Sequence, residues 1–158
     1  MKCDLRGVVL PRAELPAVLL SGSTLDDAQL QGANLQGGRL FKTRLRGADL
    51  SGANLQRAQM RDSDLAGIVL RNADLRRAYL AQSNLEGADM ADTDLRNASL
   101  EGAFLKNASL VNADLREANL FGANLSGAEW AGARLSGAYW STGKRCQPGS
   151  VGRCEQGP

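Results

Sequence analysis

Residues 103–127 read AFLKN-ASLVN-ADLRE-ANLFG-ANLSG, five copies of one five-residue pattern. The pattern extends in both directions, because every fifth position from Leu5 to Trp140 is apolar, 28 positions in all, of which 24 are Leu. The residue two places earlier is Ala in 18 of the 28 units and is small in most of the others. We call the five positions of a unit small, outward, central, first corner and second corner. Residues 3–142 form one uninterrupted array of such units.

A period of five fits neither a helix nor a continuous strand. On an α-helix, successive central residues would rotate by about 140° and define no face. On a strand, an odd spacing would send them to opposite faces in turn. We therefore expect about three extended residues, with the small and central side chains inward, followed by a corner. Gly at the second corner position in 13 of 28 units and Asn in four more suit such a corner, as do Pro11 and Pro16 at the first corner position.

The number of units in one coil follows from the polar residues at the small position. Cys3, Ser23, Thr43, Ser63 and Ser83 recur at a spacing of 20, and only Thr93 departs from this register. Four units per coil are therefore expected, which gives seven coils and a solenoid roughly 30 to 34 Å long at about 4.8 Å per coil.

The composition gives no support for catalysis. The chain has 158 residues and no His, which removes the commonest general base and the commonest zinc ligand. The glycines and Lys144 in residues 137–144 have the wrong spacing for a phosphate-binding loop. We expect no enzyme activity, no catalytic, cofactor-binding or metal-binding residues, and no cofactor. Neither a signal peptide nor a transmembrane segment is recognisable in the sequence, so no membrane association is expected.

The array resembles the pentapeptide-repeat family, in the branch with the Ala-Asp/Asn-Leu pattern seen at Ala48-Asp49-Leu50. The resemblance implies an all-β fold, a right-handed quadrilateral parallel β-helix, over residues 3–142. Residues 143–158 lie outside the repeat and are expected to form a C-terminal cap or tail.

The C-terminal end carries signs of a cap. Trp130 and Trp140 replace Leu in the last coil, and bulky residues can cover the end of a narrow tube. Cys146 and Cys154 enclose seven residues with Pro and Gly, so they form either a disulfide or two surface thiols. The tail also resembles a C-terminal signature of part of the family, which favours the disulfide. A disulfide implies a periplasmic or lumenal location, and thiols imply a cytoplasmic one. Cys3, at a small position, is expected to be a buried free thiol.

The N-terminal coil shows no cap, and it places Val9 and Leu19 at outward positions. Apolar residues beside an open edge suggest pairing with a second copy, giving a homodimer, or cover by an upstream segment. The alternative is a loosely decorated first coil without a partner.

One column of outward positions contains three Asp residues in consecutive coils. Without compensating charges, their stacked carboxylates would destabilise the fold. Asp74, Asp94 and Asp114 recur at 20 residues, and Arg76, Arg96 and Arg116 follow two residues later on the same strands. We expect an interdigitated Asp/Arg network, because stacked carboxylates repel unless they are compensated. Together with Val9 and Leu19, these six residues are the candidate interaction surface.

Two functions remain open. Solenoids generally present rigid faces to proteins, so the sequence favours a non-enzymatic scaffold for a protein partner that it does not identify. The family resemblance implies an alternative, a DNA-mimicking binder of a type II topoisomerase that protects it from quinolones. The net charge of +2 does not match B-DNA, which carries about one phosphate per 1.7 Å. Direct nucleic-acid binding is not expected either, because the basic residues are interleaved with Asp and Glu.

Overall fold

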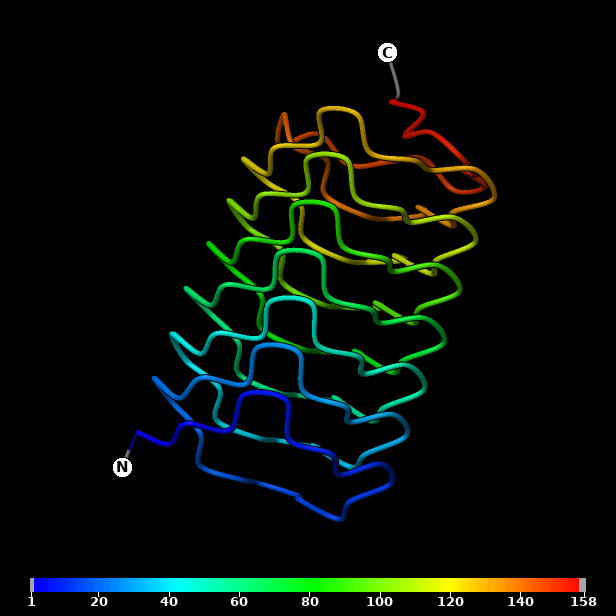
Figure 1. Ribbon diagram of the computed structural model, residues 1–158. Coiled ribbons are helices and arrows are strands. Elements are labelled where there is room, and N and C mark those ends of the chain that lie inside the picture. The colour runs from blue at the N-terminus through cyan, green and yellow to red at the C-terminus, as the bar shows by residue number, and fades with distance from the viewer. Residues whose placement is uncertain (1, 157–158) are drawn as a thin grey trace.

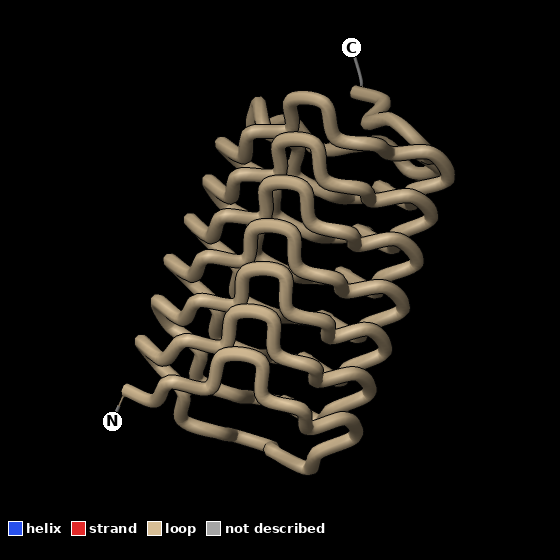
Figure 2. Tube along the Cα trace, viewed as in Figure 1, coloured by secondary structure: helices blue, strands red, loops and turns tan. Residues whose placement is uncertain are grey.

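The computed structural model describes residues 2–156, which form a stack of similar coils from the N-terminal end to the C-terminal end (Figure 1). Over these residues there is no helix and no strand longer than one bridging residue, so all of them have the loop colour in Figure 2. Each extended piece of the chain is therefore shorter than a strand of an ordinary β-sheet. The regular structure lies in the stacking of coils rather than along the chain.

Parallel bridges join outward residues that are twenty positions apart, beginning with Asp4 to Thr24 and continuing to Asn119 to Tyr139. The predicted spacing of 20 is confirmed. Four ladders of bridges run along the stack, and each ladder forms one side of it. We number the sides by their first central residue: side 1 begins at Leu5, side 2 at Leu10, side 3 at Leu15 and side 4 at Leu20.

Four of the five N–H groups in a unit bind backbone carbonyls. In the unit around Leu75, the Leu75 N–H donates to the Asp94 carbonyl at 2.8 Å and the Asp74 N–H donates to the Ala53 carbonyl at 2.9 Å. The Arg77 N–H donates to the Arg96 carbonyl at 3.0 Å, and the Ala78 N–H closes the corner onto the Leu75 carbonyl at 3.0 Å. Only the N–H at the first corner position has no backbone acceptor in this pattern.

The remaining N–H explains why Asp and Asn dominate the outward position. In twelve units an outward Asp or Asn accepts this N–H through a side-chain oxygen, as Asp74 does from Arg76 at 3.1 Å. Such a side chain satisfies a donor that the ladder leaves unpaired. Pro11 and Pro16 have no N–H to satisfy, and the outward residues before them are Val9 and Glu14.

Every second corner position from Gly7 to Gly137 has positive φ. With the hydrogen bond that closes each corner, this geometry is that of a type II turn. Fourteen of these residues are not Gly, and their φ values lie between 52° and 61°. A residue with a Cβ is disfavoured there by about 1–2 kcal/mol, so stacking imposes the corner on sequences that would not choose it locally.

The core is a column of Leu and Ala side chains. Central residues from Leu20 to Leu120 and small residues from Ser23 to Ala123 are buried, which confirms that both positions face inward. In the first coil the same positions before Leu20 are only half-buried or exposed, and Leu10 is 40 % exposed. The burial of Cys3 was predicted wrongly: its thiol is free but only half-buried, because no coil precedes it among the described residues.

Residues after the repeat fold back onto the last coil, at the upper end of Figure 1. Antiparallel bridges join Arg134 to Val151 and Tyr139 to Arg145, and Cys146 is disulfide-bonded to Cys154. The rings of Trp130 and Trp140 are 5.2 Å apart between centroids and pack against the core, as a cap requires. The tail thus covers sides 3 and 4 of the last coil. The expected tail includes residues 157 and 158, which lie outside the described residues.

Replacing a stacked central residue will destabilise the fold strongly. Leu75 is 0 % exposed and Leu19 is 68 % exposed, so Leu75→Ala and Leu19→Ala make one chemical change in opposite environments. At protein concentrations that keep the protein monomeric, we expect Leu75→Ala to lower the free energy of unfolding by about 2–5 kcal/mol and Leu19→Ala by less than about 1 kcal/mol. Urea denaturation measures both, and equal losses would contradict the inward assignment of the central position.

Removing the disulfide will loosen the C-terminal cap. Closing so short a loop is worth about 2–3 kcal/mol in the chain-entropy model. In Cys154→Ser we expect faster hydrogen exchange at Leu135, Gly137 and Trp140, whose N–H groups donate to tail carbonyls. Cys3→Ser is the control, because Ser23 and Ser63 occupy the same column and nothing is cross-linked to Cys3. Unchanged exchange in Cys154→Ser would show that the cap holds without the disulfide.

Candidate interaction surfaces

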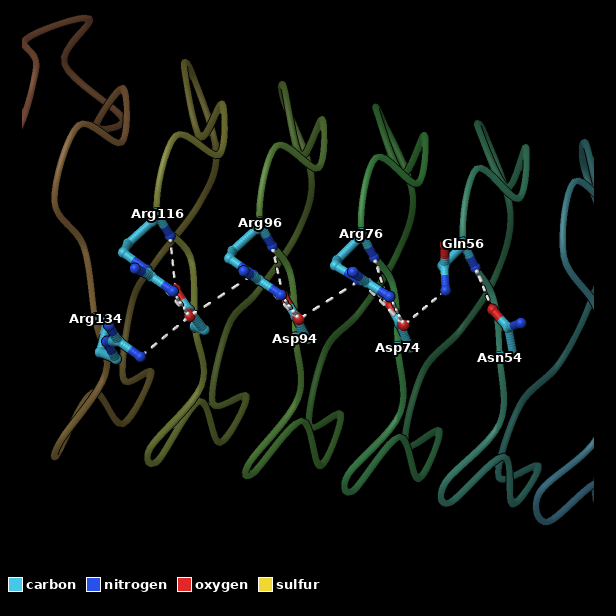
Figure 3. Close-up of polar contacts among 9 residues, drawn as sticks. Asn54, Gln56, Asp74, Arg76, Asp94, Arg96, Arg116 and Arg134 are labelled. Atoms are coloured by element: carbon cyan, nitrogen blue, oxygen red, sulfur yellow. Dashed lines mark hydrogen bonds and ion pairs between the residues drawn. The ribbon is translucent and has the colours of Figure 1, made fainter.

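The residues singled out in the sequence lie on two separate surfaces. The Asp/Arg ladder, which we define as Asp74, Arg76, Asp94, Arg96, Asp114 and Arg116, lies on side 3, away from both ends (Figure 3). Val9 and Leu19 lie on sides 2 and 4 of the first coil. No group of three or more His, Cys, Asp or Glu in residues 2–156 is placed to hold a metal ion. The described residues also contain no helix that could span a bilayer.

Each ladder Arg is held first by the Asp of its own coil. The Arg76 guanidinium donates from Nε to Asp74 Oδ1 at 2.9 Å and from Nη2 to Asp74 Oδ2 at 2.7 Å. The pairs Asp94–Arg96 and Asp114–Arg116 repeat this two-point contact. Two parallel hydrogen bonds fix the guanidinium plane as well as its position. The ladder is therefore a column of similarly oriented ion pairs.

Longer contacts connect the pairs from coil to coil. Arg76 Nε lies 3.6 Å from Asp94 Oδ2, and Arg96 Nε lies 3.8 Å from Asp114 Oδ2. At the ends of the column, Gln56 donates to Asp74 at 2.8 Å and Arg134 Nη1 lies 3.4 Å from Asp114. Each Asp thus has a donor from its own coil and another from a neighbouring coil. The predicted interdigitation is present, with the strong contacts inside each coil.

The ladder lowers the pKa of Asp74 and of Asp114. Burial alone would raise the pKa of Asp74, but the hydrogen bonds from the Arg76 side chain and backbone outweigh this effect, so the pKa is lowered. The pKa of Asp114 is lowered in the same way, with burial opposed by Arg116. The hydrogen bonds that the Arg76 guanidinium donates to Asp74 raise the pKa of Arg76 above its ordinary value. The carboxylates of Asp74 and Asp114 are therefore held ionised, and an Arg of the same coil neutralises each of them.

The N-terminal edge, by which we mean Asp4, Val9, Glu14 and Leu19, has unpaired backbone groups. The N–H groups of these four residues make no backbone hydrogen bond within residues 2–156, whereas each equivalent N–H of later coils donates to the coil before it. Val9 is 58 % exposed beside these groups. The edge therefore offers four N–H donors together with apolar surface.

Sequence reasoning missed two arginines at the corner between sides 3 and 4. Arg57 and Arg77 occupy the second corner position in consecutive coils. Their column lies next to the column of first corner positions that contains Arg76 and Arg96. Neither side chain makes an ion pair or a side-chain hydrogen bond with any residue from 2 to 156. Their spacing of 20 residues could have indicated that they stack in one column. The sequence did not reveal that the ladder carboxylates pair with other arginines.

Comparison with known families agrees with this geometry. The model for pentapeptide repeats matches eight copies, over residues 1–37, 28–67, 39–77, 73–112, 88–127 and 118–139. The chain belongs to the pentapeptide-repeat family. Known structures of pentapeptide-repeat proteins are right-handed quadrilateral β-helices, and such proteins are in general non-enzymatic structural or binding proteins.

Solved pentapeptide-repeat structures resemble the chain to different degrees. HetL, involved in heterocyst differentiation regulation in Nostoc sp. strain PCC 7120, is 34 % identical, with 90 % of this chain and 76 % of HetL covered and a TM-score of 0.38. A pentapeptide-repeat protein of the Arabidopsis thaliana thylakoid lumen is 31 % identical, with 72 % and 69 % covered and a TM-score of 0.46. The plasmid-mediated fluoroquinolone resistance protein QnrB1 is 17 % identical, with 87 % and 81 % covered and a TM-score of 0.54. No curated protein matches the chain significantly.

The lowered pKa of Asp74 gives a pH dependence with a defined sign. Because the folded-state pKa lies below the unfolded value of about 3.9, the contribution of this carboxylate is complete above that value. It is lost as the pH falls through the folded-state pKa. We expect the stability of Asp74→Asn to fall less than that of the parent protein between neutral and strongly acidic pH, measured by denaturation at each pH.

The control for this comparison is Asp92→Asn. Asp92 is exposed at a second corner position and makes no ion pair among the described residues, and Asn72 and Asn112 occupy the same column. Asp74→Asn is equally conservative, because Asn34 and Asn54 precede Asp74 in its own column. Equal acid sensitivity of the two variants would show that the ladder does not contribute to this pH dependence.

Proposed function

We propose that the protein is a non-enzymatic scaffold, a rigid solenoid of seven coils over residues 3–142 with a cap in residues 143–158, which binds protein partners. One observation carries the proposal: the buried Leu and Ala columns fix the backbone, so that outward side chains form columns in constant register. A surface of this kind recognises a partner without the entropic cost of ordering loops.

The N-terminal edge supports self-association as part of this role. Four unpaired N–H groups and an exposed Val and Leu are a template for a further coil. The carbonyls of these four residues also accept no backbone hydrogen bond within residues 2–156, so a second copy of the same edge supplies acceptors for the N–H groups and donors for the carbonyls in a closed dimer. We propose that the homodimer forms there.

The Asp/Arg ladder disfavours the DNA-mimic alternative. Each of its three Asp residues has an Arg partner in its own coil, at 2.6 to 2.7 Å. A mimic of B-DNA needs an uncompensated negative surface, since duplex DNA carries about one charge per 1.7 Å. The ladder also leaves little free negative charge for a basic topoisomerase surface to recognise.

The disulfide supports a location in an oxidising compartment, periplasmic or lumenal. Disulfides persist in such compartments and are rare in a reducing cytosol. Cys146 is 2 % exposed, and the bond closes the segment that covers the last coil, so it is part of the cap.

Light scattering tests the proposed dimer. We expect the protein to be dimeric at tens of micromolar and Val9→Lys/Leu19→Lys to be monomeric, because charges on an edge strand prevent pairing. Val69→Lys is the control, since Val69 lies in the middle of the side 2 ladder with its backbone bound on both sides. A parent protein that stays monomeric at high concentration would exclude self-association at this edge.

An assay of gyrase supercoiling distinguishes the scaffold proposal from the DNA-mimic alternative. The scaffold proposal predicts no inhibition at micromolar concentrations of the protein. Inhibition by both the parent protein and the Val9→Lys/Leu19→Lys variant would favour the DNA-mimic alternative over the scaffold proposal.

A further inference from the structure

A shallow hollow lies at the corner between sides 3 and 4, and four arginines line it. Its volume is about 320 Å³, and its walls come from three consecutive coils. We call it the arginine groove and define it by its lining residues: Gln56, Arg57, Arg76, Arg77, Arg96 and Asn97. No carboxylate is among them.

Only half of the positive charge in the groove is compensated. Arg76 and Arg96 are bound at two points by Asp74 and Asp94, as Figure 3 shows. Arg57 and Arg77 make no ion pair with any residue described by the structure, and both are exposed. No ladder carboxylate lies within ion-pair distance of either side chain. The groove therefore holds two free guanidinium groups.

The backbone beneath these two arginines is fixed. The Arg57 N–H donates to the Arg76 carbonyl at 3.1 Å, and the Arg77 N–H donates to the Arg96 carbonyl at 3.0 Å. The two side chains therefore start one coil apart, about 4.8 Å, from equivalent positions. They form a pair of donors on a rigid base, and each is long enough to adjust its guanidinium to a ligand.

Carboxylate recognition follows from this arrangement. A guanidinium binds a carboxylate through two parallel hydrogen bonds. In an extended peptide, side chains at alternate positions point the same way and lie about 6.6 to 7 Å apart. Two flexible Arg side chains anchored about 4.8 Å apart can span that separation. A segment with acidic residues at alternate positions thus matches the two free charges one to one.

A nucleic acid fits the groove less well. Sequence-independent binding of single strands uses a continuous track of cations with aromatic side chains for base stacking. No aromatic side chain is among the residues that line the groove, and it holds only two free cations. The ladder next to the groove is neutralised, so the positive surface does not extend along side 3.

We propose that the arginine groove binds a short acidic protein segment, with two carboxylates at alternate positions paired to Arg57 and Arg77. The ladder stays intact and forms one wall of the site. The proposal rests on the protein-binding role proposed above, and it names the chemistry of one partner. It does not require self-association, so the light-scattering result and the binding result are independent.

The test uses the full chain and a labelled peptide of alternating Asp and Ser, titrated by fluorescence anisotropy at low salt. The double variant Arg57→Asn/Arg77→Asn removes both free charges, and the corner accepts Asn because Asn97 follows in the same column with a φ of 60°. We expect the double variant to bind at least about tenfold more weakly. A peptide of alternating Asn and Ser serves as the uncharged probe and is expected not to bind.

Arg12→Asn is the matched control. Arg12 is also an exposed arginine at a second corner position with positive φ and no ion pair among residues 2–156, but it lies in the first coil, in the column of Asn72 and Asn112. We expect it to change peptide affinity by less than about twofold. Thermal melts of both variants should match the parent protein, which separates loss of binding from loss of fold.

Four outcomes would overturn the proposal. Equal weakening by Arg12→Asn would mean that the peptide responds to net charge rather than to the groove. Unchanged affinity in the double variant would exclude the groove as the binding site. Tighter binding of an oligothymidylate probe than of the acidic peptide, lost in the double variant, would reassign the groove to nucleic acid. A dimer without peptide binding would leave the scaffold role standing and reject this site alone.

Discussion

Backbone hydrogen bonds between residues about twenty positions apart hold each coil on the next, and the rest of the structure depends on them. They place equivalent positions in register, so a buried Leu in an inner coil lies between the central residues of the coils before and after it. They also force the chain through a positive-φ corner every five residues, even where the residue is Arg, Lys or Glu. The one N–H that they leave free selects Asp and Asn at the outward position, or Pro in place of the donor.

The same register makes the surface a set of columns, and a column of like charges must be compensated. On side 3 the compensation comes from Arg two residues later, which yields the neutral ladder. One position further on, at the corner, Arg57 and Arg77 have no such partner within the described chain. Neighbouring columns of one corner can thus differ in net charge, and a partner can distinguish them.

The two ends of the stack differ for the same reason. Stacking leaves unpaired backbone at each end of a solenoid. At the C-terminal end, residues after the repeat bind sides 3 and 4 of the last coil, and a disulfide closes that segment. At the N-terminal edge, four N–H groups stay unpaired beside Val9 and Leu19. Self-association is therefore proposed at the N-terminal edge, and partner binding on the sides.

The sequence by itself determined the period, the inward positions, the spacing of 20 and the pairing of Cys146 with Cys154 as one of two alternatives. These are local or strictly repeated properties, because a five-residue unit has the same neighbours wherever it occurs. Only the tertiary structure showed that the ladder Asp residues bind Arg inside their own coils, leaving Arg57 and Arg77 free. It also showed that Cys3 is half-buried, since burial there needs a preceding coil. A carboxylate binds one of several nearby cations according to the distances between side chains of neighbouring coils. Composition and residue spacing do not give those distances.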